Sequence, residues 1–147
     1  LIFWLKKIIS LSDLVAYVLF QIIGAIFGCL AANIIFELPI ITISTNVRHD
    51  LSQFLSEILA TFGLVLVIFL AREVARLNIP VLVGSYIASA YWFSSSTSFA
   101  NPAVTIARQF SDTFTGISPS GIPSFVLAQI FGAILGYIVV QWLSRDM

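Results

Sequence analysis

Long apolar stretches without charge alternate with short polar segments along this chain. No charged residue occurs from about Leu14 to Phe36, and residues 51–71 carry only Glu57. A membrane-spanning helix needs about 20 predominantly apolar residues. The pattern therefore predicts an all-α membrane protein with four spanning helices, at residues 12–36, 52–71, 79–98 and 123–143.

Two further apolar segments, residues 1–9 and 102–112, are too short to cross a bilayer. Pro102 suits the first position of a helix and Asn101 suits the N-cap before it. Irregular backbone at membrane depth is tolerated only where protein buries it or where it lines a wet cavity. The serine-rich stretch at 94–98, followed by a short helix at 102–112, therefore predicts a half-helix that enters the membrane and returns. An ordinary N-cap in a loop outside the membrane is the simpler alternative.

The composition agrees with a membrane protein and removes several other classes. Hydrophobic residues make up 59% of the 147 positions and charged residues 10%, and the mean hydropathy is +1.04. Soluble domains carry about 25% charged residues. Seven basic residues balance seven acidic ones, so nucleic acid is not an expected partner.

Few residues in the sequence are of the types that form disulfides, metal sites or catalytic sites. Cys29 is the single cysteine, and His49 has no second histidine, so we expect no disulfide, metal site or cofactor. We interpret Cys29 as a small packing residue. The serines at 94–98 have no histidine–aspartate partner, so the sequence predicts no enzyme.

Basic residues predict the orientation, because they favour the cytoplasmic side of short loops. If successive connections alternate sides, Arg48 and Arg108 lie on one side of the membrane. Five others lie opposite: Lys6, Lys7, Arg72, Arg76 and Arg145. We therefore expect the C-terminus in the cytoplasm.

An internal repeat links two of the predicted spans. Residues 18–28 (VLFQIIGAIFG) and 126–136 (VLAQIFGAILG) are identical at eight of eleven positions. The identities include three matched pairs: Gln21 with Gln129, Gly24 with Gly132, and Gly28 with Gly136. A Gly-xxx-Gly pattern lets two helices approach closely in lipid, which any tight helix pair can use. The shared glutamine favours a duplicated protein instead.

The repeat also predicts which parts of a full duplication are lacking. The offset of 108 residues (126 minus 18) places the counterpart of Asn101 before Leu1. We expect residues 1–9 to be the end of a first half-helix. Two spans of the first half and its own half-helix start are then missing from the sequence.

Asn101-Pro102-Ala103, after a serine-rich stretch in a duplicated membrane protein, resembles the aquaporin or major intrinsic protein family across the whole chain. Glu57, in the sequence Glu-Ile-Leu-Ala-Thr, is similar to the family's fourth-helix Glu-xxx-Thr pattern, and Gln129 to a sixth-helix glutamine. The resemblance implies an inverted-repeat helical bundle with re-entrant half-helices, here without the first two spans and the first Asn-Pro-Ala. It implies a homotetramer in the lipid bilayer that passively conducts water or small neutral solutes.

The resemblance also implies roles for single residues. The resemblance implies that Glu57 accepts hydrogen bonds from the backbone N–H groups of the re-entrant segment. As the alternative, a glutamate near a helix end can reach interfacial water. Ser89, Ser98 and Val104 fall at selectivity-filter positions, and Val104 replaces the arginine of water-selective members, as in some bacterial aquaglyceroporin-like members. A small, uncharged filter predicts passage of glycerol-like polyols and metalloid hydroxides.

Arg108 lies one helical turn beyond Val104 and is a further filter candidate. Its alternatives are pairing with Asp112 or extension to the membrane surface. A second function also stays open, a non-conducting, truncated subunit or relic that only packs with partner helices. The expected location is the bacterial inner membrane.

Overall fold

The computed structural model describes residues 1–73 and 78–144, and these residues form helices and loops without any strand. The expected orientation depends in part on Arg76 and Arg145, and both lie outside the described residues. The chain forms two compact units. The first unit comprises Leu1–Arg48 and Asn101–Pro123, and the second comprises His49–Ala100 and the residues from Ser124 onward.

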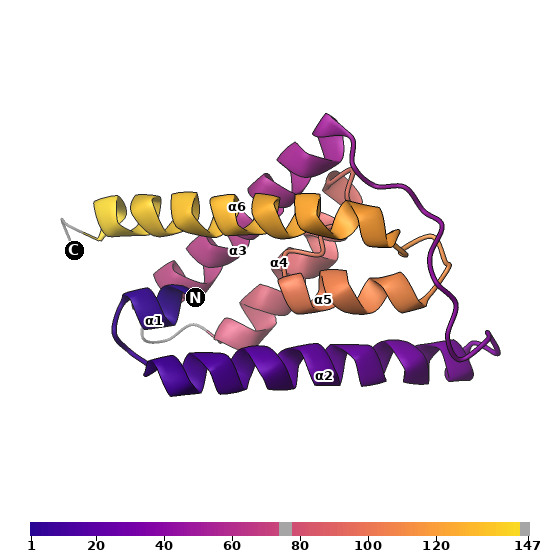
Figure 1. Ribbon diagram of the computed structural model, residues 1–147. Helices are drawn as coiled ribbons and strands as arrows, with labels where there is room; N and C mark the ends of the chain where they lie inside the picture. Colours follow the sequence, from indigo (N-terminus) through magenta and orange to yellow (C-terminus); the bar gives the residue numbers. More distant parts are fainter. Residues whose placement is uncertain (74–77, 145–147) are drawn as a thin grey trace. The chain divides into compact units, whose positions relative to one another are not determined.

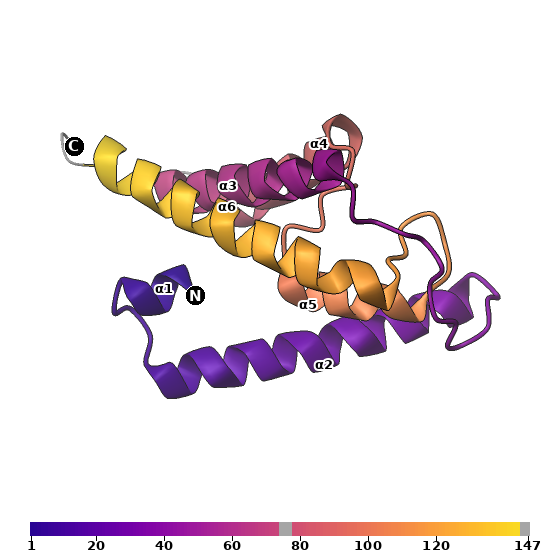
Figure 2. The same ribbon diagram turned by 45° about the horizontal axis from the view of Figure 1, so that its top comes forward.

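The first unit pairs a long helix with a short one. The long helix α2 (Leu11–Ile35) begins at Ser10, whose side chain accepts a hydrogen bond from the Asp13 N–H in a capping box. The short helix α5 (Pro102–Ala107) lies beside α2 (Figures 1 and 2). The helix α1 (Ile2–Leu5) and the 3-10 turns η1 (Arg108–Phe110) and η2 (Pro119–Gly121) complete the unit.

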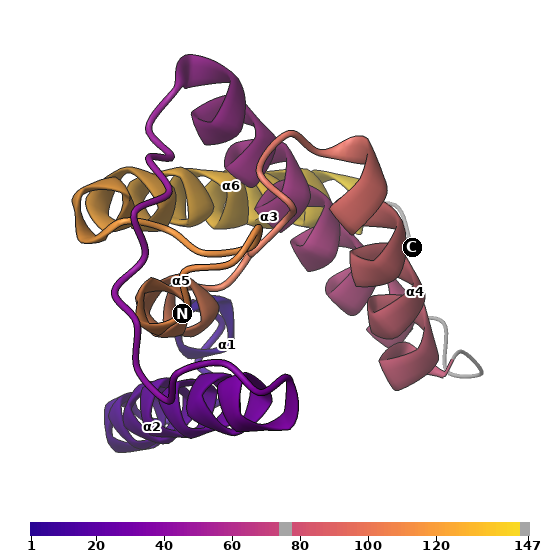
Figure 3. The same ribbon diagram turned by 90° about the vertical axis from the view of Figure 1, so that its right-hand side faces the viewer.

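The second unit contains α3 (Leu51–Glu73), α4 (Ile79–Phe93) and most of α6 (Ile122–Leu143). Figure 3 shows α3 and α4 side by side. Their close approach depends on Gly63, where an added Cβ would overlap the Tyr86 ring. The Tyr86 hydroxyl donates a 2.9 Å hydrogen bond to the Ala60 carbonyl. Gly63 on α3 therefore leaves room for the Tyr86 ring of α4, and the Tyr86 hydroxyl bonds the two helices together.

The predicted helix at 79–98 is too long. The structure ends α4 at Phe93 because Ser94 turns to extended backbone, with φ −103° and ψ 142°. The following serine is held on α3, since the Ser95 N–H donates to Ser56 Oγ at 2.9 Å and Ser95 Oγ donates to the Ser52 carbonyl at 3.1 Å. Local hydrogen bonding of this kind competes with helix continuation.

Of the four predicted spanning helices, three in the described residues are long and apolar enough to cross a membrane by length and composition. These are Leu11–Ile35, Leu51–Arg72 and Pro119–Leu143. The fifteen residues of α4 extend about 22 Å at 1.5 Å per residue, short of a hydrocarbon core of about 30 Å. The half-helix expected at 102–112 is also shorter: six α-helical residues, then the 3-10 turn η1.

The two repeat copies have different surroundings. On α6, a Cβ added at Gly132 would overlap the Ile58 carbonyl of α3, and one at Gly136 would lie 2.9 Å from the Phe62 carbonyl oxygen. On α2, a Cβ at Gly24 or Gly28 meets nothing within 4 Å. The same eleven-residue pattern therefore packs tightly against backbone in one place and remains open in the other.

Candidate functional site

The short helix α5 begins at Asn101 in the arrangement that the Asn-Pro pair predicts. Asn101 has extended backbone, with φ −153° and ψ 122°, and Pro102 begins the helix. The Asn101 side-chain oxygen accepts the Ala103 N–H at 2.9 Å, and its main-chain carbonyl accepts the Thr105 N–H at 3.0 Å.

The capping bond also orients the rest of the Asn101 side chain. Because Oδ1 is bound to Ala103, the Nδ2 amide points away from the helix backbone. Among residues 1–73 and 78–144, Nδ2 has no hydrogen-bond partner. Asn101 is half-buried, and its amide can donate two hydrogen bonds to an oxygen-bearing solute.

The segment before Asn101 has unusual backbone geometry. Thr97, Ser98 and Ala100 adopt φ values of 63°, 51° and 49°. Left-handed backbone at non-glycine residues costs about 1–3 kcal/mol each and persists only where the surroundings impose it. Three such residues within four positions require strong external support.

Glu57 of α3 provides that support. Its two carboxylate oxygens accept the Phe99 N–H at 2.8 Å and the Ala100 N–H at 2.9 Å. The Gln129 side-chain amide of α6 donates to Glu57 Oε2 at 2.7 Å. Glu57 is 0% exposed, so it does not reach interfacial water. A buried carboxylate is tolerated where it is fully hydrogen-bonded, and charge-assisted bonds are the stronger kind.

Two aromatic rings and one serine complete the support of this loop. The Phe99 ring lies 5.4 Å from the Phe125 ring, centroid to centroid. The Ser98 N–H donates to Ser96 Oγ at 3.1 Å. Ser98 Oγ itself is buried and has no partner within the described residues. The contact between Phe99 and Phe125 was not predicted, because rings on elements that are distant in sequence carry no local signal.

The predicted filter positions differ in their surroundings. In the second unit, Ser89 is exposed on α4 and donates to the Ser85 carbonyl of the same helix at 2.9 Å, whereas Ser98 is 5% exposed. In the first unit, Val104 on α5 and Arg108 on η1 are half-buried and line the same cavity.

Arg108 and Asp112 do not form the ion pair that was considered as an alternative. The Arg108 guanidinium donates to Thr115 Oγ1 at 2.8 Å. The Asp112 carboxylate instead accepts the Thr45 N–H at 2.9 Å and the Thr45 hydroxyl at 3.1 Å. The i, i+4 spacing permits the ion pair, but Thr45 of the loop at 37–50 donates hydrogen bonds to the Asp112 carboxylate instead.

Arg48 is a structural residue that the sequence did not identify. Its side chain is 6% exposed and donates to two carbonyls of the loop after η1, to Gly116 at 2.7 Å and to Phe114 at 2.6 Å. The Ser118 N–H also donates to the Asn46 carbonyl at 2.7 Å. The loop at 37–50 is thus fixed to the segment that follows α5. No local sequence pattern marks Arg48 as buried.

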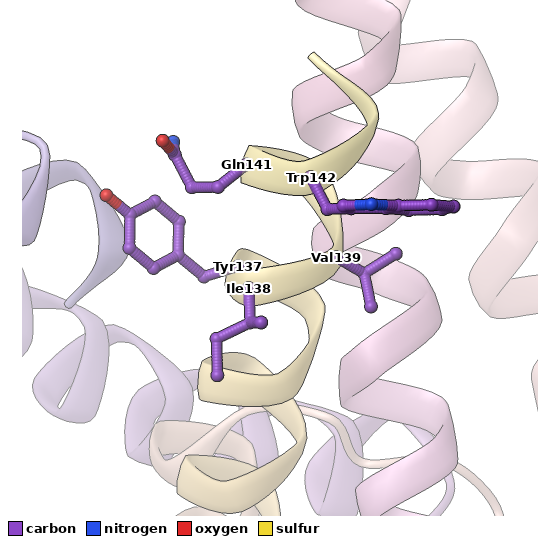
Figure 4. Close-up of a pocket in the computed structure, with 5 residues that line it drawn as sticks. All are labelled: Tyr137, Ile138, Val139, Gln141 and Trp142. Atoms are coloured by element: carbon purple, nitrogen blue, oxygen red, sulfur yellow. The ribbon is translucent and has the colours of Figure 1, made fainter. Parts of the chain in front are cut away.

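A hollow of about 410 Å³ near the end of α6 is not a candidate site. All five lining residues belong to this one helix. Figure 4 shows Tyr137 and Gln141 on one side of the helix and Val139 and Trp142 on the other. Side chains that diverge from one helix cannot surround a ligand. Within the described part of the chain, no cluster of His, Cys, Asp and Glu is suited to a metal ion.

These features define an all-α integral membrane protein in which a left-handed loop precedes the short helix α5. The chain is 46% identical over 145 residues to the aquaglyceroporin AqpS of Rhizobium meliloti (strain 1021). The match covers 99% of this chain and 62% of the relative, so the chain spans less than two thirds of that protein's length. No protein-family model and no solved structure matches the chain. This similarity agrees with the resemblance to the aquaporin, or major intrinsic protein, family that Asn101-Pro102-Ala103 indicates.

Proposed function

We propose that this protein is a passive membrane channel for water and small neutral solutes. The observation that carries the proposal is the Asn101 side chain, whose oxygen caps α5 and whose amide donors remain unoccupied in the described residues. A permeating molecule that loses water contacts needs replacement hydrogen bonds at fixed positions. Asn101 can supply them to a hydroxyl or water oxygen.

Glu57 and Gln129 have a positioning role in this proposal. They hold the left-handed loop that ends at Ala100, directly before Asn101 in the chain. A rigid donor saves the ordering cost that a mobile one would incur on each passage. No nucleophile–base pair accompanies these groups, and the family consists of channels rather than enzymes.

The solutes we propose include glycerol-like polyols and metalloid hydroxides as well as water. Ser89, Ser98 and Val104 are small and uncharged, which supports a wide constriction. The name aquaglyceroporin, carried by the Rhizobium meliloti relative, agrees with this choice. All of these solutes are neutral and hydroxyl-bearing, so a fixed donor such as the Asn101 amide suits them.

We place the channel in the bacterial inner membrane as a homotetramer with its C-terminus in the cytoplasm. The apolar helices and the family resemblance support the bilayer, and the excess of basic residues on one side supports the orientation.

Osmotic swelling of proteoliposomes tests the function. Vesicles that contain the protein are compared with protein-free vesicles for uptake of water, glycerol and arsenite. We expect all three to enter faster with protein. Water uptake without glycerol or arsenite uptake would falsify the wide constriction. Uptake equal to that of empty vesicles for all three solutes would contradict channel activity and favour a non-conducting subunit.

A further inference from the structure

A cavity of about 170 Å³ lies at the C-terminal end of α2, wholly within the first unit. Six residues line it: Asn33, Leu38, Pro39, Thr42, Ser111 and Asp112. None of them lines the cavity that Val104 and Arg108 share. Asn33 and Ser111 are buried, at 3% and 4% exposure, and Thr42 is half-buried, whereas the other three residues are exposed. The cavity therefore has a buried polar floor and opens to the surface.

The Asn33 side chain presents an acceptor to this cavity. Both hydrogens of its amide nitrogen are used, because Nδ2 donates to the Ile40 carbonyl and to the Phe110 carbonyl, each at 3.0 Å. These two bonds fix the plane of the amide. In residues 1–73 and 78–144, no donor reaches Asn33 Oδ1. Oδ1 is therefore left to accept a hydrogen bond from an occupant of the cavity.

The Asp112 carboxylate has no cationic partner within the described residues. Its Oδ1 accepts the Thr45 N–H at 2.9 Å and the Thr45 hydroxyl at 3.1 Å, whereas Oδ2 receives only a second contact from that hydroxyl, at 3.2 Å. Each carboxylate oxygen can accept about two hydrogen bonds. Oδ2 therefore keeps acceptor capacity, and the negative charge of Asp112 is not neutralised by a neighbour.

The end of α2 adds to the negative potential of this region. The carbonyl groups of the last helical turn form the negative end of the helix dipole, equivalent to about half an elementary charge. Asn33 lies in this turn, and the turn contains no basic residue. A cation in the cavity is therefore favoured by the helix end as well as by Asp112.

The polar groups that remain available in the wall suit a donor with a single positive charge. They are the Asp112 and Asn33 oxygens and the hydroxyls of Thr42 and Ser111. A protonated primary amine carries one charge and three N–H donors and has no acceptor. A neutral solute would leave the carboxylate unpaired, and a quaternary ammonium has no N–H to donate.

We propose that this cavity binds a primary ammonium group, carried either by free ethanolamine or by the ethanolamine headgroup of a phospholipid. The ammonium donates to Asp112 Oδ2, to Asn33 Oδ1 and to the Ser111 hydroxyl, and the exposed Leu38 and Pro39 contact the carbons attached to it. One positive charge then matches one carboxylate. The occupant joins the end of α2 to the segment after η1, so its binding stabilises the folded protein. This site is separate from solute conduction.

Thermal unfolding of the purified protein in detergent tests the site. Ethanolamine hydrochloride is compared with choline chloride at the same concentration, because choline carries the same charge without any N–H donor. We expect a saturating concentration of ethanolamine to raise the melting temperature by about 3 °C and choline to leave it unchanged.

Two variants identify the acceptors. Asp112→Asn keeps an oxygen for Thr45 but removes the charge, and it should weaken ethanolamine binding about fivefold, the upper end for an exposed ion pair. Ser111→Ala should weaken it about threefold, the equivalent of one hydrogen bond. Asp50→Asn is the matched control, because Asp50 is an exposed aspartate of the loop at 37–50 that does not line the cavity. Its response should equal that of the wild type.

Lipids separate the two sources of the ammonium group. Unfolding is measured in mixed micelles that contain phosphatidylethanolamine or phosphatidylcholine. Stabilisation by the ethanolamine lipid that needs Asp112, without an effect of free ethanolamine, identifies the lipid headgroup as the ligand. Stabilisation by free ethanolamine shows that the soluble amine is sufficient.

Three results would overturn the proposal. One is that neither ethanolamine nor its lipid stabilises the wild type. Another is equal stabilisation by the ethanolamine and choline compounds, which is an effect of charge alone. The third is an equal response of the wild type and Asp112→Asn. If that variant does not fold, the comparison of ethanolamine with choline on the wild type and on Ser111→Ala still decides.

Discussion

The Gln129 side-chain amide donates a 2.7 Å hydrogen bond to Glu57 Oε2, and both side chains are at most 1% exposed. This bond joins α6 to α3 and completes the coordination of a carboxylate that also holds the Phe99 and Ala100 N–H groups. Three elements that are distant in sequence therefore meet at one buried charge.

Replacement of Glu57 by glutamine should destabilise the protein by about 2–4 kcal/mol, because an amide N–H group would replace one of the two oxygens that accept the Phe99 and Ala100 N–H groups. Gln129→Met should cost less, about 1–2 kcal/mol, since the carboxylate retains its two backbone bonds. Thermal unfolding in detergent measures both. A larger loss from Gln129→Met than from Glu57→Gln would contradict the central role of the carboxylate.

The repeat provides a matched pair of glycine substitutions. Gly132→Ala should destabilise by about 2 kcal/mol or more, because the new methyl group overlaps the Ile58 carbonyl. Gly24→Ala should be neutral or stabilise by up to about 1 kcal/mol, since the position is open and alanine favours helix. Unfolding of the two variants under identical conditions tests this difference, and equal losses would refute it.

Arg48→Met should release the loop at 37–50. The change removes charged hydrogen bonds to Gly116 and Phe114 and should cost about 3 kcal/mol. Hydrogen exchange of amides in this loop should rise. His49→Ala is the control, because the neighbouring His49 is exposed and should change stability by less than about 0.5 kcal/mol. Similar exchange in both variants would mean that Arg48 does not fix the loop.

Asn101 has two roles that substitution can separate. Asn101→Asp keeps the oxygen that caps α5 but loses the amide donors, whereas Asn101→Ala loses both. The aspartate variant should retain stability, and the alanine variant should lose about 0.5–2 kcal/mol. Glycerol flux should fall about tenfold in both, the equivalent of one lost hydrogen bond. Normal flux in a stable Asn101→Asp protein would remove the amide from the conduction mechanism.

Val104→Arg should convert a wide constriction into a narrow, charged one. We expect glycerol flux to fall by about tenfold or more, a barrier increase of about 1.4 kcal/mol, while water flux persists. Val104→Leu adds bulk without charge and should reduce glycerol flux less. Parallel swelling assays with water and glycerol provide the comparison, and unchanged glycerol flux in Val104→Arg would place residue 104 away from the solute path.

The sequence by itself determined the membrane class, the helical composition and the start of the half-helix. Uncharged apolar runs, the repeat and the Asn-Pro pair are local features, and their physical consequences do not depend on distant contacts. Val104 was singled out by the family resemblance and Arg108 by its short sequence distance from Val104, and both depend only on local sequence.

Only the tertiary structure decided which polar groups are satisfied. The fourth apolar stretch ends early because its serines bond to α3, and Asp112 binds Thr45 rather than Arg108. Arg48 is buried because distant carbonyls accept its donors. Identical Gly-xxx-Gly segments on α2 and α6 differ in packing for a related reason: a sequence specifies which side chains are small, but the neighbouring backbone determines whether that space is filled.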